Sequence, residues 1–141
     1  MSIVVDSSVI VAALISTSDD GAWAERVIED GSIFAPELIR VEATNIIRRL
    51  ERAKEITEQE ANAAYDDFME LDLYLHPFEP FADRIWELRH NVTSYDAWYV
   101  ALAEALNLPL ATLDSRLAAA KGPVCRFVTP SAARRVQDRR S

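Results

Sequence analysis

Several residue types that define whole classes of proteins are scarce in this 141-residue chain. Cys125 is the only cysteine, which excludes a disulfide framework and a cysteine-based metal cluster and favours a reducing compartment. His76 and His90 have no second histidine or cysteine at metal-ligand spacing, so surface or hydrogen-bonded roles are expected for both. The three glycines and six prolines are scattered, and we find no linker, repeat or low-complexity segment. We therefore predict one compact domain over residues 1–141.

Long apolar runs are also missing. The apolar segments at residues 9–15 and 97–103 are much shorter than the roughly 18 residues that a membrane-spanning helix needs. The N-terminal segment carries no basic residues, and Asp6 interrupts its apolar start, so no signal peptide is predicted. We expect a cytoplasmic protein that does not interact with a membrane.

Positive charge is scarce overall and is concentrated in two segments. The net charge of −8 argues against a nucleic-acid partner, because phosphate binding depends on lysine and arginine. However, residues 40–54 contain five basic residues and two acids, and residues 116–140 contain seven and one. This distribution permits a local basic rim beside an acidic body, although solvated helix faces would produce the same asymmetry.

Short apolar strands alternate with helical patterns along the whole chain. Strands are predicted at residues 3–6, 32–35, 73–77, 108–114 and 124–128. The main helices are predicted at residues 7–16, from residue 19 onward, and at residues 36–54, 57–71, 80–91, 94–104 and 130–139. Such alternation predicts an α/β fold in which helices cover both sides of a parallel sheet.

The first predicted strand runs directly into Asp6. Its three consecutive β-branched residues, Ile3, Val4 and Val5, favour a strand buried on both faces, as in a parallel sheet. The carboxyl end of such a strand opens into the crevice where α/β proteins bind ligands. Asp6 is therefore a candidate ligand residue. Taken alone, it is equally well explained as the N-cap of the helix that starts at Ser7.

Two further aspartates have comparable positions. Asp114 also follows an apolar strand, and strand alternation places Thr112 on the same face. Asp96 lies in the first turn of a helix that is apolar on almost every side. An acid there is favourable at the positive end of a helix, with Ser94 as the expected cap. A charge beside so much apolar surface nevertheless needs partners or a metal.

Glu42 is the fourth candidate acid. The buried stripe of its helix is predicted to consist of Ile39, Ala43, Ile46 and Leu50. Glu42 points roughly 60° away from the centre of that stripe, on the flank that also carries Asn45. A glutamate in a surface ion pair is the simple interpretation, but this flank also suits the wall of a site.

These four carboxylates can all point into one crevice. Gathered there, they would repel one another and raise one another's pKa values unless a cation were present. Ligation by oxygen atoms alone suits Mg²⁺ or Mn²⁺. The joint placement of Asp6, Glu42, Asp96 and Asp114 therefore predicts a divalent metal site more strongly than any one of them does.

Four parts of the sequence, in this order, are similar to one known family. They are VDSS at residues 5–8, Glu42 with Asn45, SYDAWYVALA at residues 94–103 and TLD at residues 112–114. The chain resembles the PIN-domain ribonucleases, specifically the VapC-type toxins of type II toxin–antitoxin pairs. The resemblance covers nearly the whole chain. It implies a PIN-like three-layer α/β/α sandwich with a central, mainly parallel sheet.

The resemblance also implies an activity, a metal and partners. Asp6, Glu42, Asp96 and Asp114 would be the acidic quartet that holds Mg²⁺ or Mn²⁺ directly or through water. Ser7 and Thr112 would orient ligands or bound water, and the reaction would be hydrolysis of RNA phosphodiester bonds by metal-activated water. The expected partners are an RNA substrate, a cognate VapB-like antitoxin and a second copy in a homodimer.

One position departs from the family pattern. Some members carry a further acid two residues after the position of Asp114, where this chain has Arg116, so a second tightly bound metal is not expected. Arg116 is instead a candidate for phosphate contact, and Arg48, Arg49 and Arg52 are candidates that line the approach. An ordinary surface role is the alternative for all four arginines.

Two other functions are compatible with parts of the sequence. A receiver-type signalling module is also an α/β protein with acids at strand ends, and Lys121 resembles the lysine that such domains place late in the chain. Against it, no pair of adjacent acids ends the first strand, and Glu42 and Asp96 gain no role. A catalytically inactive PIN-like binding protein is the third possibility.

Overall fold

The computed structural model describes residues 1–130 and contains one five-stranded sheet. The strand order is β3-β2-β1-β4-β5, and every pairing is parallel. The strands are β1 (Ile3–Val5), β2 (Ile33–Pro36), β3 (Leu73–His76), β4 (Leu110–Ala111) and β5 (Phe127–Val128). β1 therefore lies at the centre, as expected for a strand of three β-branched residues that is buried on both faces.

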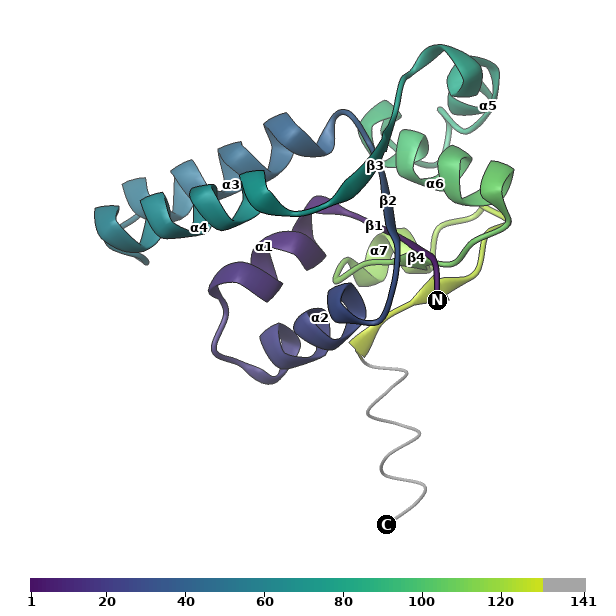
Figure 1. Ribbon diagram of the computed structural model, residues 1–141. Coiled ribbons are helices and arrows are strands. Elements are labelled where there is room, and N and C mark those ends of the chain that lie inside the picture. The colour runs from purple at the N-terminus through teal and green to yellow at the C-terminus, as the bar shows by residue number, and fades with distance from the viewer. Residues whose placement is uncertain (131–141) are drawn as a thin grey trace.

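The helices lie on both sides of this sheet. They are α1 (Ser7–Ile15), α2 (Asp19–Glu29), α3 (Ile39–Arg52), α4 (Glu58–Glu70), the short 3₁₀ helix η1 (Glu79–Phe81), α5 (Ala82–Glu87), α6 (Ser94–Leu106) and α7 (Ser115–Ala118). Figure 1 shows α1 to α4 on one side of the strands and α5 and α6 on the other. The predicted three-layer α/β/α sandwich is confirmed. No helix within residues 1–130 has the length and apolar character needed to cross a bilayer.

α6 packs against the middle of the sheet and forms a large part of the core. α6 contacts β1, β2 and β4, and its side chains from Tyr99 to Ala103 are all buried. Val4 and Val5 of β1 are also completely shielded from solvent. The apolar character of α6 on nearly every side, which is evident in the sequence, follows from this central position.

Several local predictions were wrong. Pro36 ends β2 instead of starting α3, because the N–H of Glu37 makes the next hydrogen bond to β3, at 3.0 Å from the His76 carbonyl. Thr93, not Ser94, caps α6, since its hydroxyl accepts the N–H of Asp96 at 3.2 Å. Tyr65 of α4 is 42% exposed, although an aromatic residue at this spacing with Ala61, Ala64 and Phe68 would be expected to point inward.

Other predicted elements differ in extent. The helix predicted at residues 80–91 is divided into η1 and α5, and the strands predicted at residues 108–114 and 124–128 are reduced to two residues each. On α3, Ile47 completes the buried stripe with Ile39 and Ala43, whereas Ile46 and Leu50 are half-buried. The helix predicted at residues 130–139 lies almost entirely outside the described residues.

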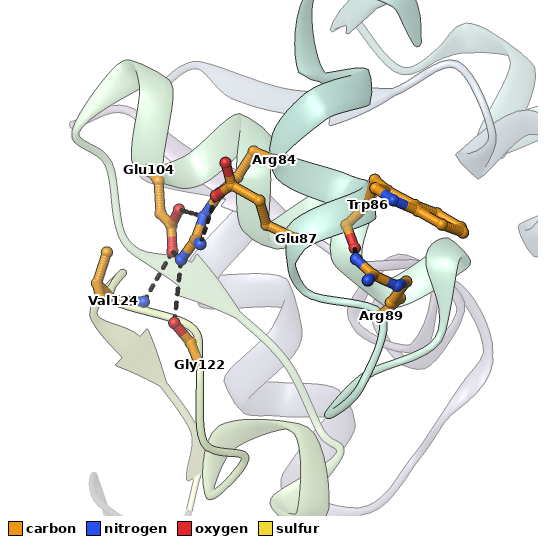
Figure 2. A network of polar contacts seen from close by, with 7 residues as sticks. All are labelled: Arg84, Trp86, Glu87, Arg89, Glu104, Gly122 and Val124. Carbon is orange, nitrogen blue, oxygen red and sulfur yellow. Dashed lines mark hydrogen bonds and ion pairs between the residues drawn. The ribbon is translucent and has the colours of Figure 1, made fainter.

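A polar network fastens the far end of α6 to its neighbours (Figure 2). The Arg84 guanidinium on α5 donates to both carboxylate oxygens of Glu104, with Nε 2.7 Å from Oε1 and an Nη atom 3.2 Å from Oε2. The same guanidinium donates to the Gly122 carbonyl at 3.0 Å, and Glu104 also accepts the Val124 N–H at 2.7 Å. Glu104 is well shielded from solvent, so this bidentate pair counts for more than an ordinary surface ion pair.

We predict that Arg84→Ala lowers the free energy of unfolding by about 1–2 kcal/mol, because it leaves the Glu104 carboxylate with a single donor. Arg89→Ala on the same stretch is the matched control. Arg89, just after α5, stacks on the exposed ring of Trp86 at 4.3 Å, and among residues 1–130 its side chain donates only to the Trp86 carbonyl, so its loss should cost below about 1 kcal/mol. Urea denaturation measures both values, and equal losses in the two variants would contradict the assignment.

Candidate active site

Asp6 lies at the carboxyl end of the central strand and is only 7% exposed. Its carboxylate accepts the backbone N–H of Val9 at 3.2 Å, so it is the N-cap of α1. It also accepts the Ser8 hydroxyl at 2.5 Å and the Thr112 hydroxyl. The two interpretations of Asp6 are compatible, because one residue both caps the helix and places its carboxylate at the end of the sheet.

Thr112 joins the end of β4 to the end of β1. Its side chain is fully buried, and while its hydroxyl donates to Asp6 it also accepts the N–H of Asp114 at 3.0 Å. Ser8 makes a second connection, since its oxygen accepts the N–H of Leu113 at 3.3 Å. These bonds bring two residues of the predicted quartet, Asp6 and Asp114, to adjacent strand ends.

Ser8 is a site residue that the sequence prediction missed. The family resemblance assigns an orienting role to Ser7, but in the structure it is the hydroxyl of Ser8 that donates to Asp6. Ser7 is half-buried and lies near Tyr99, where its hydroxyl lowers the pKa of the phenol slightly against the larger opposing effects of burial and Glu42. Helix geometry could have identified Ser8, because the hydroxyl of a serine two residues after an N-cap aspartate can reach back to that carboxylate.

Glu42 lies in the first turn of α3 and is half-buried. Its carboxylate accepts the hydroxyl of Tyr99, which comes from α6, with 2.7 Å between Tyr99 Oη and Glu42 Oε1. Tyr99 is only 1% exposed. The simple interpretation of Glu42 as a surface ion-pair residue is therefore wrong, since its observed partner is a buried phenol.

The other two aspartates occupy the starts of helices. Asp96 is half-buried in the first turn of α6, where its N–H donates to Thr93. Asp114 is exposed and caps α7, with Oδ1 accepting the N–H groups of Arg116 at 2.9 Å and Leu117 at 3.3 Å. Both positions leave carboxylate oxygens available at the edge of the sheet from which Asp6 emerges.

Electrostatic effects connect all four acids. Burial raises the pKa of Asp6 above its usual value, and the charge of Asp96 raises it further. Burial also raises the pKa of Glu42, with added repulsion from Asp96 and Asp6. The pKa of Asp96 is raised by burial and then by Asp114. Hydrogen bonds from Ser8, Thr112, Val9, Tyr99 and Thr93 oppose these shifts without cancelling them.

The donor set fits a hard divalent cation by its chemistry. All four candidate ligands are carboxylates, and three of them have raised pKa values that a nearby positive charge would lower. Within residues 1–130, however, no three such side chains are arranged as a ready-made metal-binding group. The acids share a region and an electrostatic field, while their final approach to a cation would require side-chain adjustment.

The supporting residues differ in their placement. Asn45 is exposed on α3, one turn beyond Glu42. Arg48, Arg49, Arg52 and Arg116 are also exposed, and within the described part of the chain none of them forms an ion pair. Arg49 lies seven residues after Glu42, which corresponds to almost the same direction from the helix axis and about 10 Å of rise. It is the arginine of α3 that follows the flank of Glu42.

The fold and these acids define a class of protein. The family model described as "PIN domain" matches residues 3–123, which is most of the chain and includes all four acids and the residues that hydrogen-bond to them. Among solved structures, PAE2754 from Pyrobaculum aerophilum superimposes with a TM-score of 0.69 at 20% identity, covering 98% of this chain and 90% of that one. A toxin–antitoxin complex from Klebsiella pneumoniae gives 0.60 at 18% identity, covering 91% and 97%. At these identities the likeness shows a shared fold.

A curated relative is closer in sequence. Ribonuclease VapC1 of Mycobacterium tuberculosis is 42% identical over 123 residues, which are 86% of this chain and 92% of that protein. The chain therefore belongs to the PIN domain family and is of the VapC type.

The raised pKa values predict how stability depends on pH in the metal-free protein. An acid whose pKa is higher in the folded than in the unfolded state binds protons more tightly when folded. Its contribution to stability is then greatest at low pH and declines as the pH rises from about 4 through the folded-state pKa. We predict that Asp96→Asn reduces the loss of stability that accompanies a rise in pH from about 4 to 7, because the variant has no carboxylate to deprotonate at this half-buried position.

Chemical denaturation in the presence of a chelator measures this effect at each pH. Asp66→Asn, which changes an exposed aspartate of α4, is the control and should leave the pH dependence as in the wild type. An Asp96→Asn profile parallel to that of the wild type would show that Asp96 carries no repulsion in the folded state.

Proposed function

We propose that this protein is a metal-dependent endoribonuclease that hydrolyses RNA phosphodiester bonds and acts as the toxin of a toxin–antitoxin pair. The observation that carries the proposal is the group of three mutually repelling carboxylates, Asp6, Glu42 and Asp96, at the carboxyl edge of a PIN-domain sheet. Maintaining this repulsion costs stability, and a catalytic cation would relieve it. The similarity to a protein named ribonuclease VapC1 supports RNA as the substrate.

Asp6, Glu42, Asp96 and Asp114 would hold Mg²⁺ or Mn²⁺. A cation bound there would lower the pKa of a water molecule and stabilise negative charge on the phosphate and on the leaving oxygen. Asp6, fixed by three donors, would be the most rigid ligand. Asp114 is the most exposed and would adjust most readily to the substrate.

The side-chain hydroxyls of the site are suited to positioning and not to nucleophilic attack. Ser8 and Thr112 both donate their protons to Asp6. Burial and the neighbouring Glu42 raise the pKa of Tyr99, so its phenolate form is strongly disfavoured. Water is therefore the nucleophile in the reaction we propose. Thr112 would keep the carboxylate of Asp6 oriented, and Ser7 would act through Tyr99.

We further propose that arginines guide the RNA backbone. Arg49 follows the flank of Glu42, while Arg52 and Arg48 point roughly 80° and 120° away from Glu42 around the same helix. Arg116 is the second residue of α7, two positions after Asp114. A basic approach along α3 would hold phosphates near acids that by themselves repel RNA.

The remaining parts of the proposal are the partners. A VapB-like antitoxin that covers the acidic site, and a homodimer, are what the VapC-type family implies. The fold shared with a toxin–antitoxin complex from Klebsiella pneumoniae is in accord with the first of these.

The activity is tested by incubating the protein with structured RNAs and Mg²⁺ or Mn²⁺. We expect cleavage by the wild type, loss of cleavage on chelation, and at least about a hundredfold lower rate for Asp6→Asn and for Asp96→Asn, because each removes a metal-binding charge. Asp66→Asn should cleave as the wild type does. Equal rates in all variants would refute the assignment, and a phosphate adduct after treatment with a small phosphodonor would favour a receiver-type protein.

The arginine path is tested by RNA binding at several salt concentrations. Arg49→Ala should weaken binding and lower the slope of log K against log salt by about one, because one phosphate contact is lost. Arg26→Ala on α2, also an exposed arginine, is the matched control and should change neither quantity. Identical salt dependence in the two variants would rule out the role of Arg49.

A further inference from the structure

Tyr99 brings a buried hydroxyl into direct contact with the acidic site. It lies three residues after Asp96 on α6, and its ring belongs to the central core. Its hydroxyl donates to Glu42 Oε1 at 2.7 Å and therefore connects two helices that are 57 residues apart in sequence. A phenylalanine would fill the same core volume, so the hydroxyl needs an explanation beyond packing.

The hydrogen bond has an effect on Glu42 that no other residue duplicates. Glutamate has three rotatable side-chain bonds, and fixing them in one orientation costs conformational entropy. Among residues 1–130, Tyr99 is the single hydrogen-bond donor to the Glu42 carboxylate, whereas Asp6 has three donors. The orientation of Glu42 therefore depends on one contact.

The contact also places the two carboxylate oxygens of Glu42 in different environments. Oε1 is occupied by the phenol, while Oε2 has no donor among the described residues. Repulsion from Asp96 and Asp6 pushes the Glu42 carboxylate away from the other acids. A rigid donor anchored in the core opposes that movement, because a tyrosine side chain has few rotatable bonds and is held by its packing.

We propose that Tyr99 is a positioning residue that holds Glu42 in the orientation needed to bind the divalent cation. This inference rests on the proposed function, since it assumes that Glu42 is a metal ligand. It assigns to Tyr99 a task that is separate from its place in the core. Groups that orient metal ligands typically change metal affinity or activity by about 10–100-fold when they are removed.

The test compares Tyr99→Phe with the wild type in a calorimetric titration with Mn²⁺ alone. We expect the variant to bind Mn²⁺ about tenfold or more weakly, while its melting temperature stays within a few degrees because the ring is retained. Adding the same change to Glu42→Gln should have no further effect, since the oriented charge is already absent. Tyr65→Phe, on the outer side of α4, should bind as the wild type does.

A second variant addresses the same point with Tyr99 in place. Glu42→Asp keeps the charge but retracts the carboxylate from the phenol, and it should also lose affinity for Mn²⁺ and become insensitive to Tyr99→Phe. The inference is overturned if Tyr99→Phe binds Mn²⁺ within twofold of the wild type, or if its effect persists in the Glu42→Gln background. Wild-type protein that neither binds Mn²⁺ nor cleaves RNA would overturn the proposed function as well, so the two failures are distinguishable.

Discussion

The buried carboxylate of Asp6 is the constraint on which the rest of the site depends. A charge at the end of a central parallel strand loses most of its hydration, and that loss costs several kcal/mol unless donors replace the water. Here the donors come from the first turn of α1 and from Thr112 at the end of β4. The same bonds that compensate the burial of Asp6 also fix β1, α1 and β4 relative to one another. The position of the Asp6 carboxylate and the fold are thus stabilised by one set of contacts.

α6 connects the hydrophobic core with the chemistry of the site. Its apolar residues pack on β1, β2 and β4, while Asp96 and Tyr99 reach the acidic edge from the same helix. A helix that is buried on nearly every side has little freedom to shift. The positions of Asp96 and Tyr99 are therefore fixed by the packing of the apolar residues of α6.

The sequence predicted the parts of this arrangement that depend on local pattern. The order of strands and helices and the parallel sheet follow from the periodicity of apolar residues along the chain. The common location of Asp6, Glu42, Asp96 and Asp114 could be predicted because the carboxyl ends of parallel strands meet at one edge of the sheet. The contact between Tyr99 and Glu42 was not predictable, since it depends on how far α6 and α3 rotate and slide when they pack. The extent of β4 and β5 was missed for a similar reason, because their ends are set by pairing partners.

The mutual repulsion of the acids must be offset by stabilising contacts elsewhere, and several of these contacts hold α6 in place. At its first turn Thr93 fixes the backbone beside Asp96, and at its last turn Arg84 clamps Glu104 to α5 and to the segment before β5. Both ends of the helix are therefore held by polar contacts while its middle is held by packing. Repulsion at the Asp96 end is resisted along the whole length of the helix. The strain of gathering these acids is expressed in their protonation: burial and neighbouring carboxylates raise the pKa values of Asp6 and Asp96.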